Sequence, residues 1–207
     1  MAKKKSKQEF LNSVREEVVF LGFADEMLFA VEERLGLKKN YHILLFPGGI
    51  KEVISLLEAD LDKDMSEQIS RMAAKSDMRV REIIKESIKV RLKGNKEMLS
   101  QLSKYYFNLN NFTFAYKNFW RTVDQIWYVA GDQSTDFNHY TKRGLLFCVY
   151  KATFLHYVSS ENDESTWGFL DKRIENALKI GKIKKFPKET IQKIKEKIPF
   201  IRLMNRK

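Results

Sequence analysis

Breaks between helices are scarce in this sequence, and that scarcity constrains the fold more than any other feature. Nine glycines and three prolines interrupt 207 residues, of which 43% are hydrophobic and 13% aromatic. This composition is too apolar for a disordered chain, and so few breaks favour long helices. At this length we expect one compact domain with tails. The predicted fold class is all-α.

Apolar residues recur at helical spacing along most of the chain. Three short helices are predicted first, at about residues 10–18, at 27–35 and in the segment YHILLFPGG, and they resemble the start of a TetR-type helix-turn-helix domain. Longer helices are predicted to follow, at about residues 53–65, 77–93, 110–130, 137–158 and 163–181. We therefore expect a basic tail over residues 1–7, a single TetR-like helical domain over 8–181 and a second basic tail over 182–207.

The net charge of +11 is concentrated at the two ends of the chain. Residues 1–7 carry +4 and residues 182–207 carry +8, which leaves −1 for residues 8–181. Residues 8–60, where a DNA-reading head would lie, hold five Lys/Arg against ten Asp/Glu. Such a head should present a basic face to phosphates. We therefore expect no nucleic-acid partner. The alternative function, which would need such a partner, is a TetR-type lipid-responsive transcription regulator.

Residues 110–130 are unusually aromatic, and their rings fall on more than one face of a helix. We expect this helix to be central and mostly buried, either as ordinary core or as the wall of an apolar ligand cavity. Cys148, in the apolar run GLLFCVY, is expected to pack in the core. The next helix carries His139, Tyr140 and Arg143 in its first turns, where they can form one surface cluster. This cluster could be a partner-binding site, or a solvated face with a tyrosine anchoring the core.

The sequence shows no catalytic or metal-binding signature. The three histidines, His42, His139 and His156, do not have the ligand spacing of a metal site, and the sequence contains no phosphate loop, nucleophile elbow or dinucleotide fingerprint. Asp132 and Asp136 stand where helix caps are needed. The sequence therefore predicts no enzyme, no metal and no cofactor.

Two segments, WYVAGDQSTDFNHYTKRGLL and TWGFLDKRIENALKIG, together resemble the ubiquinone (coenzyme Q) biosynthesis accessory family, the lipid-binding ninth member of the Coq set. The resemblance is strong over about residues 115–181 and loose before them. It implies a TetR-like fold that forms a homodimer, with a helix-turn-helix part over 8–60 that has lost DNA binding. The part over 61–181 would then serve lipid binding and dimerisation.

The resemblance also implies partners and site residues. A cavity would receive an isoprenoid quinone intermediate or another lipid, and a patch at the start of the helix over 137–158 would bind the di-iron demethoxyubiquinone hydroxylase. Most family members carry Trp at the position of His139, so the patch is altered here. The cavity is expected at Phe112, Tyr116, Phe119, Trp120 and Trp127, and the patch at His139, Tyr140, Lys142 and Arg143.

The C-terminal tail has the layout of an interfacial helix, with an isoleucine stripe flanked by lysines. A helix of this length is marginal in water, so it should form on lipid or dock on the body. The first ten residues lack the apolar run of a signal peptide and the spaced arginines of a transit peptide. We therefore expect a bacterial cytoplasmic protein, peripheral at the inner face of the cytoplasmic membrane. The expected membrane-binding residues are Lys188, Ile191, Lys193, Ile194, Lys195, Lys197, Ile198 and Ile201.

Overall fold

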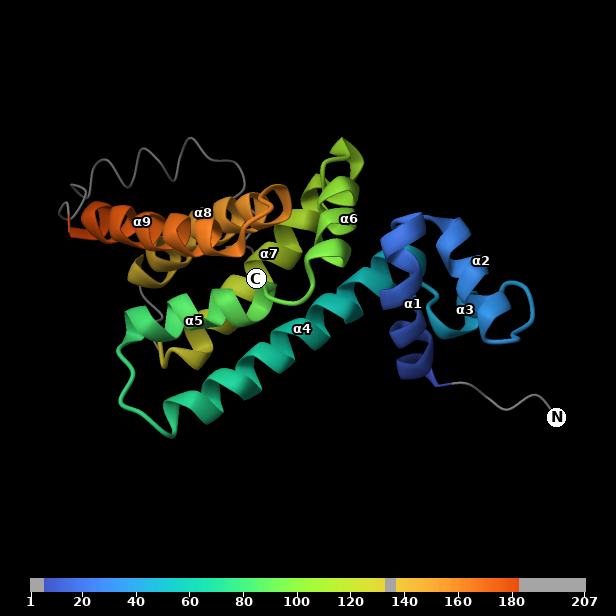
Figure 1. Cartoon of the computed structure of the whole chain (residues 1–207), viewed down its shortest axis with the longest axis horizontal. Helices are drawn as coiled ribbons and strands as arrows, with labels where there is room; N and C mark the ends of the chain where they lie inside the picture. Colours follow the sequence, from blue (N-terminus) through green and yellow to red (C-terminus); the bar gives the residue numbers. More distant parts are fainter. Residues whose placement is uncertain (1–5, 133–136, 183–207) are drawn as a thin grey trace.

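The computed structural model describes residues 6–132 and 137–182, and these residues form helices and short connections without strands (Figure 1). The expected all-α fold class is confirmed for this part of the chain. The α-helices are α1 (Lys7–Leu21), α2 (Asp25–Arg34), α3 (Tyr41–Leu45), α4 (Gly49–Ala73), α5 (Val80–Leu92), α6 (Lys96–Tyr106), α7 (Phe112–Val129), α8 (Phe137–Ser159) and α9 (Asp163–Lys182), and a 3-10 turn, η1 (Leu109–Asn111), lies between α6 and α7.

Helices α1 to α3 gather at one end of the molecule, and the long α4 runs from them into a larger helical body (Figure 1). In that body α7 packs between α4 and α8, while α5 and α9 cover the side away from α1. Helix α6 packs on α8 and also on α1, so it joins the two ends. Helix α4 runs without a break across residues 60 and 61, where we placed the boundary between the two parts of the domain.

Helix α6 was not predicted from the sequence, although it carries a clear apolar face. Met98, Leu99, Leu102 and Tyr106 are buried at helical spacing, while its charged residues Glu97 and Lys104 are exposed. The apolar pattern of this helix covers only eleven residues, directly before the much more aromatic segment of α7. This omission matters because α6 supplies one wall of the candidate site.

Cys148 is exposed, so the prediction that it packs in the core is wrong. Around it Leu146, Val149 and Tyr150 turn inward, and Cys148 lies on the opposite side of α8. Apolar residues surround this part of the helix on nearly all sides, so the sequence pattern does not say which face is inside.

A buried ionic cluster ties α4, α5, α6 and α7 together. The Arg91 guanidinium donates to Asp62 at 2.7 Å and to Glu58 at 3.0 Å, and its side chain is fully buried. The Thr122 hydroxyl donates to Asp62 at 2.9 Å, and Arg121 donates to the same carboxylate at 3.1 Å. Charges this deeply buried are tolerated only when they are paired and hydrogen-bonded, so the cluster fixes how these helices meet.

Candidate lipid-binding cavity and partner surface

An apolar cavity of about 210 Å³ opens between α6, η1, α7 and α8. Most of the side chains around it are aromatic or aliphatic, and polar groups are few. The lining consists of Ser103, Tyr106, Phe107, Asn108, Leu109, Phe112, Ala115, Tyr116, Phe119, Lys151, Phe154 and Leu155.

Edge-to-face contacts between aromatic rings build the inner wall of this cavity. The Phe119 ring lies 5.5 Å from Tyr106 and 5.2 Å from Phe154, measured between ring centroids, with interplanar angles of 60° and 78°. Such pairs are favourable beyond the area they bury and hold their rings in fixed orientations. The wall is therefore preformed.

The wall is backed by the buried ionic cluster. The Tyr106 hydroxyl donates to Glu58 at 2.5 Å, so the ring that faces the cavity is held from behind. Burial raises the pKa of Glu58, although the neighbouring Arg91 charge opposes the shift. Burial, reinforced by the Glu58 charge, also raises the pKa of Tyr106 well above its ordinary value. The phenol therefore remains a neutral donor near neutral pH.

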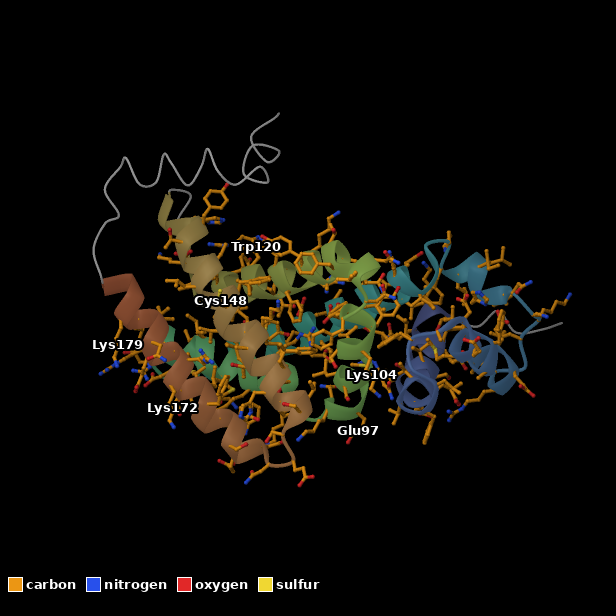
Figure 2. All side chains as sticks on the ribbon, turned by 90° about the horizontal axis from the view of Figure 1, so that it is seen from above. Glu97, Lys104, Trp120, Cys148, Lys172 and Lys179 are labelled. Carbon is orange, nitrogen blue, oxygen red and sulfur yellow. The ribbon has the colours of Figure 1, made fainter. Side chains whose placement is uncertain are left out.

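Three of the five residues expected to bind lipid line this cavity, namely Phe112, Tyr116 and Phe119. Trp120 does not line it. Its ring stacks on that of Tyr116 at 5.8 Å and lies 6.1 Å from the Phe147 ring, beside the part of α8 that carries Cys148 (Figure 2).

Trp127 is the fifth of these residues, and it lies almost two turns further along α7. The Lys142 ammonium is 5.6 Å from the centre of its ring. The structure thus adds the α6 and η1 side of the cavity to the predicted set and places both tryptophans outside it.

The cavity is smaller than the roughly 300–1,000 Å³ of pockets that enclose a whole drug-sized ligand. Phe107, Leu109 and Phe112 at its edge are exposed, so it opens to the surface. Space of this size and lining suits one part of an extended apolar chain. Among the described residues, no group of His, Cys, Asp and Glu is arranged to hold a metal ion, and no helix has the length and hydropathy to span a bilayer.

The expected partner patch lies at the corner between α7 and α8. Gly131 takes φ +78° just after α7, where a left-handed residue favours glycine, and the following Asp132 amide donates back to the Trp127 carbonyl at 3.0 Å. Arg143 is only 5% exposed, and its guanidinium pairs with both Asp132 and Asp124. Its side chain therefore braces the corner from inside and does not join a surface cluster.

The other three patch residues are more accessible than Arg143. Tyr140 is 53% exposed, and its ring meets the half-buried His139 ring edge-on at 5.1 Å. Lys142 is partly exposed, and its ammonium donates to Asp132 at 2.7 Å. Tyr128, exposed in the last turn of α7, was not in the predicted set. The end of α7 and the start of α8 thus present two exposed tyrosines above an internal ion-pair brace.

The predicted membrane-binding residues of the C-terminal tail, between Lys188 and Ile201, lie outside the described residues, as does Asp136.

Comparison with known proteins supports the resemblance drawn from the sequence. Residues 112–181 match the family model COQ9, and this segment contains α7, α8 and nearly all of α9. "Ubiquinone biosynthesis protein COQ9, mitochondrial" of Rattus norvegicus is 49% identical over 70 residues, which cover 33% of this chain and 22% of the rat protein. The expected resemblance to the ubiquinone biosynthesis accessory family is confirmed.

Two other relatives match longer parts of the chain. "Probable ubiquinone biosynthesis protein coq9, mitochondrial" of Dictyostelium discoideum is 34% identical over 116 residues, which cover 54% of this chain and 38% of that protein. "Ubiquinone biosynthesis protein coq9, mitochondrial" of Schizosaccharomyces pombe is 28% identical over 175 residues, which cover 81% of this chain and 68% of that protein. The matched region thus spans about a fifth of the rat protein and about two thirds of the fission-yeast one.

The prediction of a bacterial cytoplasmic protein is wrong. The relatives from rat, human, Dictyostelium and fission yeast are all named as mitochondrial proteins, which points to mitochondria. The prediction rested on the composition of the first ten residues. So short a segment is a weaker indication of compartment than a match over 70 residues.

Proposed function

We propose that this chain, whose residues 112–181 match the COQ9 family model, serves ubiquinone biosynthesis as a non-catalytic lipid-binding accessory protein. It binds an isoprenoid quinone intermediate at a membrane and presents it to the di-iron demethoxyubiquinone hydroxylase, which carries out the chemistry. It acts as a homodimer, and residues 182–207 hold it on the membrane through their isoleucine stripe and lysines.

The apolar cavity between α6, η1, α7 and α8 carries this proposal. Its aromatic wall is preformed, and seven of its twelve lining residues belong to residues 112–181. An isoprenoid chain is apolar, unsaturated and flexible, so it gains from burial against rings and needs few hydrogen bonds. A cavity of about 210 Å³ that opens to the surface holds one end of such a chain while the rest stays in lipid.

Lipid extraction of the purified chain, read by mass spectrometry, tests the cavity. We expect a co-purifying isoprenoid or phospholipid, and a clear loss of it in Ala115→Phe, because Ala115 lines the cavity and the added ring fills it. Ala74→Phe, at an exposed position after α4, is the matched control. Leu155→Trp fills the cavity from α8 if the first variant does not fold. Equal lipid content in all folded variants would contradict the proposal.

Presentation to the hydroxylase depends on the corner of α7 and α8. Tyr140 is the exposed anchor there, because an amphipathic ring gains contact area at a small cost in side-chain entropy. Lys142 adds an exposed charge beside it, and Arg143 supports both from inside. We expect Tyr140→Ala to weaken binding of the purified hydroxylase at least roughly tenfold, as for a hot-spot tyrosine.

Phe20→Ala is the control for that experiment, because it removes an exposed ring at the end of α1, outside the α7–α8 corner. Circular dichroism and melting temperature confirm that both variants are folded. Unchanged hydroxylase affinity in Tyr140→Ala would show that the corner is not the contact.

No observation on the N-terminal helices favours the alternative of a transcription regulator. Helix α3, which holds five residues, exposes Ile43 and Leu44, and residues 8–60 carry a net negative charge. Neither feature suits contact with DNA phosphates.

A further inference from the structure

The corner between α6 and α7 projects from the body of the molecule (Figure 1). Its large apolar residues are exposed. Phe107 directly follows α6, Leu109 begins η1 and Phe112 begins α7, and these residues are 70%, 90% and 62% exposed. Isolated exposed apolar residues are ordinary, but three large ones on a single projecting corner mark an interaction surface.

The polar groups of this corner are largely satisfied within it. The Asn108 side chain accepts from the Asn110 amide at 3.0 Å, and the Asn111 side chain donates to the Tyr105 carbonyl at 3.1 Å. Such local bonds lower the cost of moving backbone into an apolar setting, because the groups need less water.

The charges around the corner are of one sign. Residues 98–123 contain Lys104, Lys117 and Arg121 and no acidic residue, and Lys151 of α8 stands at the cavity. The lysines are exposed, whereas Arg121 pairs with the buried Asp62. Asp25, the first residue of α2, lies outside the corner. Burial, together with the charge of Asp25, raises the pKa of Tyr105. An apolar tip beside lysines complements an anionic surface with an apolar interior.

The same three apolar residues also line the cavity, so the corner and the cavity form one continuous apolar path. A lipid chain that moved from a membrane into the cavity through this corner would pass Phe107, Leu109 and Phe112 before it met Tyr116 and Phe119. If this corner faced water, an extracted apolar chain would have to cross water to reach the cavity.

From this geometry we infer that the α6–η1–α7 corner inserts into the interfacial region of an anionic bilayer, with Leu109 deepest and the exposed lysines at the level of the lipid phosphates. The cavity then opens directly into the apolar part of the membrane. The inference deepens the proposed lipid-binding function and gives the route by which lipid enters. It assigns membrane contact to residues 107–112 in addition to the tail.

A depth measurement on the full chain tests the insertion. Total vesicle binding does not decide it, because residues 182–207 carry +8 and would bring the chain to anionic vesicles whichever face meets the lipid. A chain with Leu109→Cys and Cys148→Ser is labelled with an environment-sensitive fluorophore and mixed with phosphatidylcholine–cardiolipin vesicles containing a lipid-bound quencher. We expect a blue shift and strong quenching.

Leu44→Cys in the same Cys148→Ser background is the matched control. Leu44 is also a highly exposed leucine, at 76%, but it lies on α3, among the N-terminal helices and away from the α6–α7 corner (Figure 1). Its label should stay in water while the label at position 109 enters lipid. A label at 109 that stays in water on vesicle-bound protein overturns the inference, as does one that is shielded only when the hydroxylase is added.

Leu109→Asp gives an independent readout that needs no label. Full burial of one leucine side chain strengthens partitioning by roughly tenfold or more, so we expect vesicle affinity to fall by about that factor, with Leu44→Asp unchanged. Equal affinities of the two variants overturn the inference.

Lipid extraction separates this inference from the proposed function. If lipid occupies the cavity but the label at position 109 stays in water, the proposed function stands and the insertion is wrong. If the label at position 109 enters lipid but no lipid is extracted from the chain, the insertion stands and the lipid-binding function is wrong.

Discussion

The Arg143 guanidinium donates through Nη1 to Oδ2 of Asp132 at 3.1 Å, and both side chains are almost fully buried. The pair joins the third residue after α7 to the second turn of α8, and Asp124 on α7 holds the same guanidinium from another side. A residue predicted to meet a partner therefore fixes the corner on which the exposed Tyr140 stands.

Arg143→Ala should destabilise the chain strongly. Removing the guanidinium leaves the buried Asp132 with the partly exposed Lys142 as its remaining cation, and we expect the free energy of unfolding to fall by about 3 kcal/mol. Lys142→Ala is the control, because Lys142 pairs with the same aspartate from a partly exposed position and should cost no more than about 1 kcal/mol. Urea denaturation measures both values. Similar stability of the two variants would mean that Arg143 does not brace the corner.

Arg91→Met tests the ionic cluster behind the cavity. The change leaves Glu58 and Asp62 without their main cation, so we expect a loss of about 3–5 kcal/mol in unfolding free energy. Adding Glu58→Gln to Arg91→Met should recover part of that loss, because one uncompensated buried charge is removed. A thermal or urea denaturation series on the single and double variants gives the comparison. If the double variant were less stable than Arg91→Met alone, uncompensated charge would not be the cause of the loss in stability.

Alkaline pH should unfold the chain through its buried tyrosines. Burial raises the pKa of Tyr150, whereas a phenol in the unfolded chain ionises near pH 10. Above about pH 10 the unfolded state therefore holds fewer protons than the folded state, and stability falls as pH rises toward the raised pKa. Tyr150→Phe should show a shallower fall in melting temperature above that pH, with Tyr128→Phe, an exposed tyrosine, as the control. Parallel curves for wild type and Tyr150→Phe would disprove the assignment.

Glu32 holds the connection between α2 and α3 through three contacts. Its buried carboxylate accepts from the Asn40 amide at 3.0 Å and the His42 amide at 2.7 Å, and lies 2.6 Å from His42 Nδ1. We expect Glu32→Ala to cost about 2–3 kcal/mol and to speed hydrogen exchange over residues 37–45, because two amides lose their acceptor. Glu33→Ala, at an exposed neighbouring position, should leave exchange unchanged. Unaltered protection in Glu32→Ala would contradict this role.

The helical spacing of apolar residues was readable from the sequence over most of the chain, α6 excepted. The predicted helices over 10–18, 27–35, 53–65, 110–130, 137–158 and 163–181 all correspond to observed helices, with differences of a few residues or, for α4, an extra turn or two at the ends. The confirmed family resemblance also rests on local runs of residues.

Position within the folded body was harder to read. Cys148 and Arg143 show opposite errors, since an apolar context did not bury the thiol and a charge did not expose the guanidinium. Which side of α8 faces inward depends on α7 and α9 packing against it, and a buried arginine depends on Asp124 and Asp132 meeting it from other segments.

The sequence by itself determined that this chain is helical, where most helices begin and end, and which family it resembles, because each follows from neighbouring residues and their spacing. The tertiary structure decided which aromatic residues surround the cavity, that α6 and η1 form its mouth and that Arg143 lies inside. These properties arise only when segments far apart in the chain pack together, and burial is set by the partner surfaces as much as by the residue itself.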